Sequence, residues 1–191
     1  MNGIKGLVIA SLTTLSLNAH AGLMGVSEIV IKNSLDLWIQ VSEVAATETG
    51  TGNDLALSSA GAMATGSGNW SAASSPDKAI DGAGPLDYPF MYHSDGKGPS
   101  EFLKIVLGSP SELDSLSIFG RTGCCSSRDV FDVYLYNDKQ EELFSGKYYS
   151  AANPQHMVLI DLPDTVIPEP ASIGLVMLGL AGLGLSRRKK A

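Results

Sequence analysis

The chain has 191 residues, of which 44% are hydrophobic, and its 20 acidic and 13 basic side chains give a net charge of −7. A chain of this length can bury the core of one domain. The acidic balance argues against nucleic acid or an anionic membrane surface as a partner. Neutral sugars or divalent cations fit better, although acidity can also serve solubility alone.

The first 21 residues have the pattern of an export signal. Lys5 supplies a positive start, residues 6–17 are apolar, and the small-x-small sequence AHA occupies residues 19–21. Signal peptidase cuts after such a pattern, so we expect cleavage between Ala21 and Gly22. The apolar run is shorter than the roughly 20 residues of a membrane-spanning helix. A buried N-terminal helix is the alternative.

Short segments rich in β-branched and aromatic residues follow, and none has a sustained helical period. We expect strands at 26–31, 37–44, 102–107, 113–120, 130–138 and 156–162, and a weaker one within 55–70. Many short strands separated by turn residues are typical of an all-β sandwich or jelly roll.

The connections contain residues that favour turns. Ser75 as N-cap, Pro76 at the first helical position and Gly82 as the stop predict a single helical turn. Residues 83–100 are expected to form a long loop, and Asn137 with Asp138 indicates a hairpin connection.

The C-terminal segment, residues 166–191, is a second apolar run with a basic end. Pro168, Glu169 and Pro170 precede a glycine-rich apolar stretch at 173–185, and four basic residues follow at 187–190. A basic cluster after such a run stays cytoplasmic by the positive-inside rule. In order and placement the segment resembles the PEP-CTERM sorting signal.

That resemblance implies a short transmembrane helix with a basic tail. It implies an inner-membrane intermediate that the membrane protease exosortase processes at the Pro-Glu-Pro box. It also implies a Gram-negative bacterium that makes extracellular polysaccharide. A chance proline-glutamate-proline before an ordinary tail anchor is the alternative.

Residues 22–165 are then the expected folded domain. Removing Lys5 and the four basic tail residues leaves 8 basic side chains, and removing Glu169 leaves 19 acidic ones. The net charge of the domain is therefore near −11, which strengthens the argument against nucleic acid.

Within the domain, SPDKAIDG, YHS, EFLKIVLGSP, LDSLSIFGRTGCC and VFDVYLYN occur in this order between residues 75 and 137. This order resembles the discoidin and coagulation factor C-type domains, and it is closer to the fucose-binding F-type lectins. The resemblance runs from about residue 56 to 162. It implies a galactose-binding-like jelly roll in which residues 26–44 form the first strands.

The only two cysteines, Cys124 and Cys125, are neighbours in GRTGCCSSRDV. In an exported protein an even number of cysteines indicates a disulfide, and these two can pair only with each other within the chain. A bridge between neighbours adds almost no loop-closure entropy, but it can lock a turn and present a flat sulfur surface. The spacing argues against zinc or redox chemistry. A structural turn without a ligand, or two reduced thiols, is the alternative.

The F-type lectin resemblance assigns roles around this turn. It implies that His93, Arg121 and Arg128 hydrogen-bond sugar hydroxyls while the sulfur pair packs against the sugar. A rigid guanidinium fork suits two neighbouring hydroxyls. Gly123 stands where the family has the aspartate that orients the first arginine, so Asp129 is a candidate replacement. A surface-loop histidine and a solvated strand end are the alternatives for His93 and Arg128.

The resemblance also implies a calcium ion in the loop around an AxDG turn. In KAIDGAGPLDYP, Asp81 and Asp87 would supply hard oxygen ligands. Lys78 occupies the place of a family asparagine. An ordinary Asp-Gly turn is the alternative.

An enzyme is not expected. No G-x-S-x-G elbow occurs, and no spacing singles out a glycosidase carboxylate pair. We expect Glu101, Asp132 and Asp161 to face outward. The sequence thus predicts an exported lectin-like module that binds glycans or matrix polysaccharide at the cell surface, as in a biofilm. The alternative is a structural or adhesion protein of the matrix whose sandwich binds protein partners.

Overall fold

A computed structural model describes residues 22–33, 35–150 and 155–165. The expected signal peptide with Ala21, and the sorting segment with its Pro-Glu-Pro box, lie outside these residues. Within the described ranges, no helix is long and apolar enough to cross a membrane.

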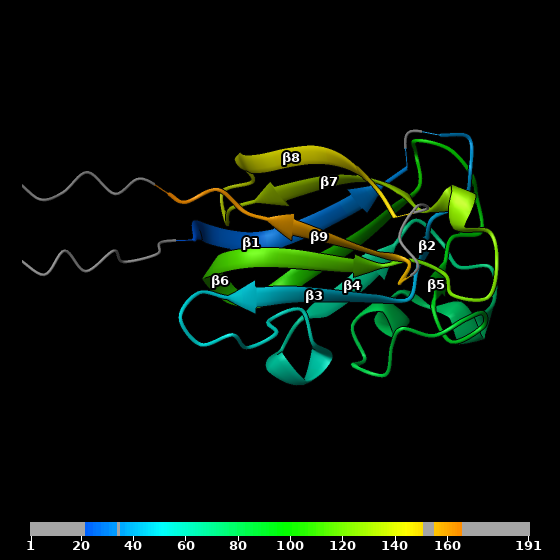
Figure 1. Cartoon of the computed structure of the whole chain (residues 1–191), viewed down its shortest axis with the longest axis horizontal. Helices are drawn as coiled ribbons and strands as arrows, with labels where there is room; N and C mark the ends of the chain where they lie inside the picture. The colour runs from blue at the N-terminus through cyan, green and yellow to red at the C-terminus, as the bar shows by residue number, and fades with distance from the viewer. Residues whose placement is uncertain (1–21, 34, 151–154, 166–191) are drawn as a thin grey trace, which may run out of the picture.

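The described part is built from β strands joined by loops with short 3-10 turns (Figure 1). The strands are β1 (Leu23–Lys32), β2 (Gln40–Val41), β3 (Glu43–Glu48), β4 (Met63–Gly66), β5 (Tyr92–His93), β6 (Phe102–Phe119), β7 (Val130–Tyr136), β8 (Glu142–Tyr149) and β9 (Met157–Asp161). The turns are η1 (Ser58–Ala60), η2 (Ala72–Ser74), η3 (Pro76–Ala79) and η4 (Ser126–Arg128).

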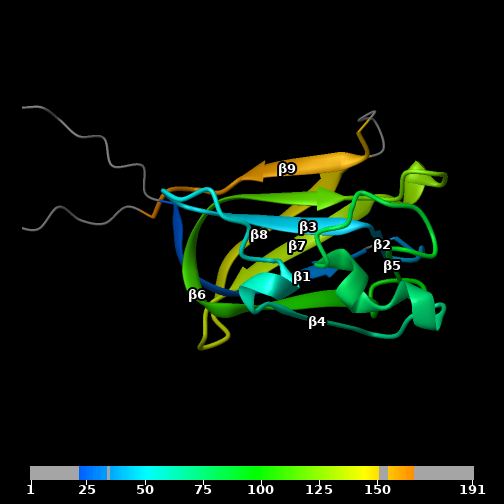
Figure 2. The same ribbon diagram turned by 90° about the horizontal axis from the view of Figure 1, so that it is seen from below.

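The long strand β6 connects two layers of antiparallel strands. β4 pairs with its first half, β3 and β9 pair with its second half, and β1 pairs along it from Phe102 to Leu113. Figure 2 shows the strand curving from one layer into the other. The curve passes through Gly108, Ser109 and Pro110, which are exposed. On the first layer, β1 continues the sheet to β7 and then β8.

The core lies between these layers, and the alternation of the strands explains it. Ile29 and Ile31 of β1 point inward together with Ile105 of the first half of β6, and all three are fully buried. Leu116 and Ile118 face them from the second half of β6. Each such side chain contributes roughly 1.5–3 kcal/mol by leaving water.

The layered antiparallel β structure agrees with the sequence-based expectation, and the jelly-roll assignment stays a prediction. The predicted helical turn is η3. Four details differ. The expected strands 102–107 and 113–120 are one strand, and the segment 37–44 becomes extended only at Gln40. The short strand β5 lies within the expected loop 83–100, and β8 had not been predicted.

Two carboxylates expected to face outward do not. Glu101 and Asp132 are buried, whereas Asp161 is exposed as predicted. Glu101 accepts a hydrogen bond from the Ser67 hydroxyl, and Asp132 lies 3.5 Å from the Lys147 ammonium. Both carboxylates are therefore compensated inside the fold, as buried charges require.

The two ends of the described domain lie together, away from the β2–β5 end of the sandwich (Figure 1). The Thr165 N–H donates to the Gly22 carbonyl oxygen at 3.2 Å, and the Met24 N–H donates to the Thr165 hydroxyl at 3.0 Å. The chain thus enters and leaves the domain at one end.

Candidate functional site

The predicted binding residues are carried by loops at the end of the sandwich opposite the termini. The loop between β6 and β7 carries Arg121, the cysteine pair and Arg128, and β5 carries His93. The loops that connect β1 to β2 and β4 to β5 supply the neighbours described below. β2 and β5 form a small two-stranded ladder there, in which Gln40 pairs with His93.

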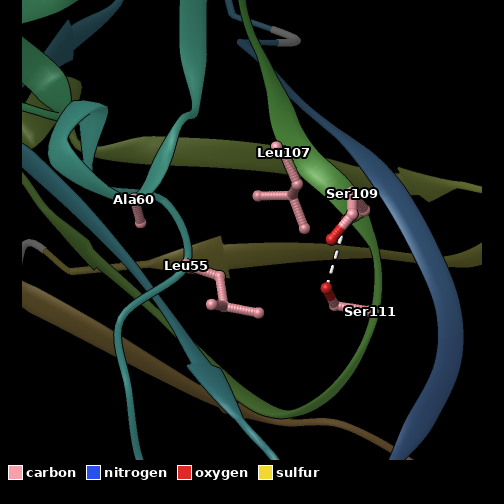
Figure 3. A pocket seen from close by; sticks show the side chains of 6 residues that line it. Leu55, Ala60, Leu107, Ser109 and Ser111 are labelled. Carbon is pink, nitrogen blue, oxygen red and sulfur yellow. Dashed lines mark hydrogen bonds between the residues drawn. The ribbon is translucent and has the colours of Figure 1, made fainter.

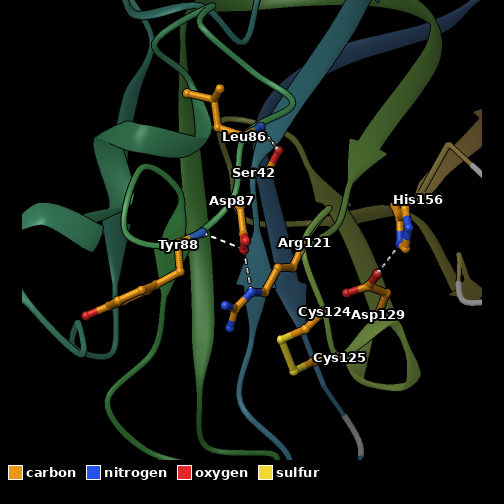
Figure 4. A network of polar contacts seen from close by, with 9 residues as sticks. All are labelled: Ser42, Leu86, Asp87, Tyr88, Arg121, Cys124, Cys125, Asp129 and His156. Atoms are coloured by element: carbon orange, nitrogen blue, oxygen red, sulfur yellow. Dashed lines mark hydrogen bonds and ion pairs between the residues drawn. A yellow bond between two sulfur atoms is a disulfide. The ribbon is translucent and has the colours of Figure 1, made fainter.

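Arg121 is held by Asp87. Its Nε donates to the Asp87 Oδ1 at 2.6 Å, and the Tyr88 N–H donates to the same oxygen at 2.7 Å (Figure 4). Partial burial would by itself raise the pKa of Asp87. The hydrogen bonds from Tyr88 and Arg121, the positive charge of Arg121 and the Gly123 N–H outweigh it and lower the pKa below its usual range. The carboxylate therefore stays ionised and fixes the guanidinium.

Gly123 makes room for this contact. A β-carbon at Gly123 would overlap the Asp87 carboxylate. The F-type lectin pattern has an aspartate at this position. In this chain the carboxylate of Asp87, which comes from a different loop, fills the space that the side chain of that aspartate would occupy. The suggestion that Asp129 orients Arg121 is wrong, because Asp87 makes that contact.

The loop that carries Asp87 is fixed to the beginning of β3. The Leu86 N–H donates to the Ser42 hydroxyl at 2.9 Å, and the Gly84 N–H donates to the Glu43 Oε2 at 3.1 Å. Ser42 in turn donates its N–H to the Phe119 carbonyl oxygen at the end of β6. The two loops that bring the aspartate and the arginine together therefore share one anchoring residue.

His93 lies at the centre of an aromatic cluster and is only 6% exposed. Its ring centroid is 5.7 Å from that of Trp70, 5.9 Å from that of Tyr88 and 6.1 Å from that of Trp38. Burial lowers the pKa of His93, and the charges of Arg121 and Arg128 lower it further. The imidazole is therefore neutral at pH 7.

The tautomer of His93 follows from its backbone contact. Its Nδ1 lies 2.8 Å from the Ser94 carbonyl oxygen, which can only accept, so Nδ1 carries the proton. In the neutral ring Nε2 is then a hydrogen-bond acceptor. The site combines this acceptor with the guanidinium donors of Arg121.

Three cations stand over the aromatic rings of this end. The Lys97 Nζ is 4.0 Å from the centroid of Trp38, and the Arg128 Cζ is 4.6 Å from the same ring. The Arg121 Cζ is 5.7 Å from the centroid of Tyr88. Such cation–π contacts contribute about 0.5–1 kcal/mol each at exposed sites. Arg128 is thus attached to the cluster rather than solvated at a strand end.

Cys124 and Cys125 are joined by a disulfide beside Arg121 (Figure 4). Cys125 has a φ of 65°, in the left-handed region, and it precedes the η4 turn that ends at Arg128. Such a conformation is uncommon for a residue with a side chain. The bridge therefore shapes the segment that separates the two arginines.

Asp129 lies behind this turn, next to His156. Its carboxylate is fully buried, His156 Nδ1 is 3.7 Å away, and among the described residues it has no hydrogen bond of standard geometry. Burial raises the pKa of Asp129 to about 6, although the Ser150 hydroxyl, the Arg121 N–H and His156 each lower it. A β-carbon at Gly120 would overlap this carboxylate, so the segment packs closely against it.

The contacts of Asp81 and Asp87 do not fit a calcium ion held by both. The Asp81 carboxylate accepts from the Lys78 Nζ at 3.1 Å and from the Ala83 N–H at 2.9 Å, and Asp87 holds Arg121. In the part of the chain that the structure describes, no group of three or more acidic, histidine or cysteine side chains is placed to bind a metal.

Sequence reasoning missed the aromatic part of the site and the role of Asp87. The chain has two tryptophans, and their rings lie 6.1 Å apart at 89°. Trp70 is 56% exposed, which is unusual for so large an apolar side chain. Trp38 falls within the expected strand 37–44 and Trp70 ends the weaker strand expected within 55–70, so the sequence pattern marked neither as part of a site.

A small pocket occurs elsewhere, at the bend of β6 (Figure 3). Leu55, Ala60, Leu107 and Ser109 are among its lining residues, and its volume is about 30 Å³. That volume holds one or two water molecules. It is too small for a sugar.

Comparison with known proteins identifies the C-terminal segment. Residues 166–189 match the PEP-CTERM protein-sorting motif, which includes Pro168, Glu169 and Pro170. No curated protein and no solved structure matches the chain. The motif marks an exported protein that passes through the membrane to exosortase and the cell surface.

Proposed function

We propose that the domain is a non-enzymatic, lectin-like carbohydrate-binding module that acts at the cell surface or in the extracellular matrix. The observation that carries the proposal is the Asp87–Arg121 pair beside the ring cluster of Trp38, Trp70 and His93. An exported, exosortase-processed protein is placed where glycans are abundant. The alternative is a matrix protein with protein partners.

The chemistry of this end suits a sugar. Pyranose rings have apolar C–H faces, which pack on exposed aromatic side chains such as Trp70, and hydroxyl pairs, which a guanidinium fork can bind. With its Nε tied to Asp87, Arg121 keeps its other nitrogens as donors. Neutral His93 adds an acceptor, so donors and acceptors of hydroxyl groups are both available.

The fixed geometry of Arg121 also supports the proposal. A long side chain that is already ordered loses less rotamer entropy when it binds a ligand. Here the ordering comes from the carboxylate of Asp87, from the Tyr88 ring and from the disulfide turn. None of these three features packs in the hydrophobic core.

The test is a glycan array probed with the full chain, expressed with export and purified in oxidised form in mild detergent. Arg121→Ala should lose retention of the bound sugar class by at least about tenfold. Lys139→Ala removes the same charge from the distant β7–β8 turn and should bind as the unchanged protein does. Equal binding by the Arg121 variant, or silence of the folded protein across the array, would leave the protein-partner alternative.

A further inference from the structure

We infer that this site prefers a carboxylate-bearing sugar, a uronic acid, and that Lys97 and Arg128 are the residues that determine this specificity. The inference rests on the proposed function and adds the class of ligand. The inference starts from the position of these two cations on one indole ring, that of Trp38. The Lys97 Nζ is 4.0 Å and the Arg128 Cζ is 4.6 Å from the centroid of this ring.

Neither cation is neutralised by the protein. Among the residues that the structure describes, no carboxylate lies within ion-pair distance of Lys97 or Arg128. Of the six other basic residues of the domain, Lys78, Lys104, Arg121 and Lys147 each have a carboxylate within 4 Å. Lys32 and Lys139 have none among the described residues, but they do not share one ring as Lys97 and Arg128 do. A domain with 19 acidic residues thus leaves two cations uncompensated at one point of its surface.

Two positive charges beside one ring attract an anion to this point of the surface. Lys97 and Arg128 both contact the Trp38 ring, and the charges of both would favour a bound carboxylate. Burial is the main cause of the lowered pKa of His93, and the charge of Arg128 lowers it further. A carboxylate beside Trp38 could accept a charge-assisted hydrogen bond from Lys97 or from Arg128.

The neighbouring rings favour a sugar carboxylate over a small free anion. Trp70 is in contact with Trp38 and exposes more than half of its surface, so an apolar ring face can pack there while the carboxylate reaches the cations. Arg121, with its charge matched by Asp87, remains for neutral hydroxyls. The site therefore has a charged part and a neutral part.

The test compares polygalacturonate with the same polymer after reduction of its carboxyl groups, using the full chain in mild detergent at 50 and 500 mM salt. The unchanged protein should bind the acidic polymer at least about tenfold more tightly at low salt, and the ratio should shrink at high salt because screening weakens the ion pairs. Free galacturonate should compete, and acetate or galactose at the same concentration should not.

The double variant Lys97→Met with Arg128→Gln should bring the ratio of the two polymers near one, because the acidic polymer should lose much more affinity than the reduced polymer does. Lys139→Met, the matched charge control, should leave the ratio unchanged. Equal binding of both polymers by the unchanged protein, still dependent on Arg121, would overturn the acidic-sugar inference alone. Competition by acetate as strong as by galacturonate would also overturn it. No binding of either polymer or of any arrayed glycan would overturn the proposed function as well.

Discussion

The pair formed by Asp87 and Arg121 can be tested through Gly123, which touches neither a ligand nor the core. In Gly123→Ala the new methyl group would overlap the Asp87 carboxylate, which must then leave the Arg121 Nε. The backbone of Gly123 is outside the left-handed region, so alanine adds no strain of its own. The variant therefore removes the orientation of Arg121 while both charged side chains remain.

The expected magnitudes differ for stability and for binding. The side chain of Asp87 is 41% exposed, so the pair contributes less than about 1 kcal/mol to folding. For a domain of this size that loss lowers the melting temperature by no more than about 4 °C. A hydrogen bond from a charged group to a ligand contributes about 1.5–3 kcal/mol, so sugar affinity should fall by about tenfold or more.

Calorimetry and the glycan that the array identifies would measure the two effects on the same samples. Asp87→Asn should give the same loss of affinity as Gly123→Ala. The double variant should lose no more than either single one, because all three break the same contact. Unchanged affinity in Gly123→Ala, or additive losses in the double variant, would refute the positioning role of Asp87.

Two further predictions concern the disulfide turn and the residue behind it. Replacing both Cys124 and Cys125 by serine should weaken sugar binding at least about fivefold. The melting temperature should shift by only a few degrees, because a disulfide between neighbouring residues constrains the unfolded chain little. Loss of the folded state in this variant would contradict the prediction. Asp129→Asn should raise stability at pH 7.5 by about 3 kcal/mol, since the folded-state pKa of about 6 is above the ordinary value of 3.8 and the buried charge opposes folding. The folded protein holds the proton more tightly, so this penalty is absent below about pH 4 and grows as the pH rises through 6. Melting curves of both proteins from pH 4 to 7.5 should therefore converge at the acid end, and a constant difference would contradict the assignment.

The strands were the predictable part of this fold, because period-two alternation is a local property. The first part of β6 and β9 follow it closely, with Leu103, Ile105 and Val158 on the buried side. The union of two predicted strands into β6 was not predictable in this way. Gly108 and Pro110 read as turn residues, yet both halves of the strand keep partners across the bend.

The site was predictable only in part, because its decisive contact joins residues 34 positions apart. The resemblance to F-type lectins suggested Arg121 and the cysteine pair, and a resemblance transfers roles only to matching positions. Because Gly123 occupies the position of the family aspartate, the resemblance could not predict which carboxylate contacts Arg121. Asp87, two loops away, fills the space that the family aspartate would occupy. Its position depends on tertiary packing, because the hydrogen bond from Leu86 to Ser42 fixes the loop that carries it.

The opposite placement of the termini and the loop cluster determines how the domain carries mechanical load. For a protein held at the cell surface by the segment after Thr165, a pull on a captured polymer runs from the loop end to the terminal end, along the length of β9. This strand pairs with β6 from Met157 opposite Phe119 to Asp161 opposite Ser115. Its hydrogen bonds are perpendicular to that direction, so they are loaded together in shear instead of being peeled apart one at a time. If the proposed glycan binding holds, this geometry lets the domain keep its shape while a bound polymer pulls on it.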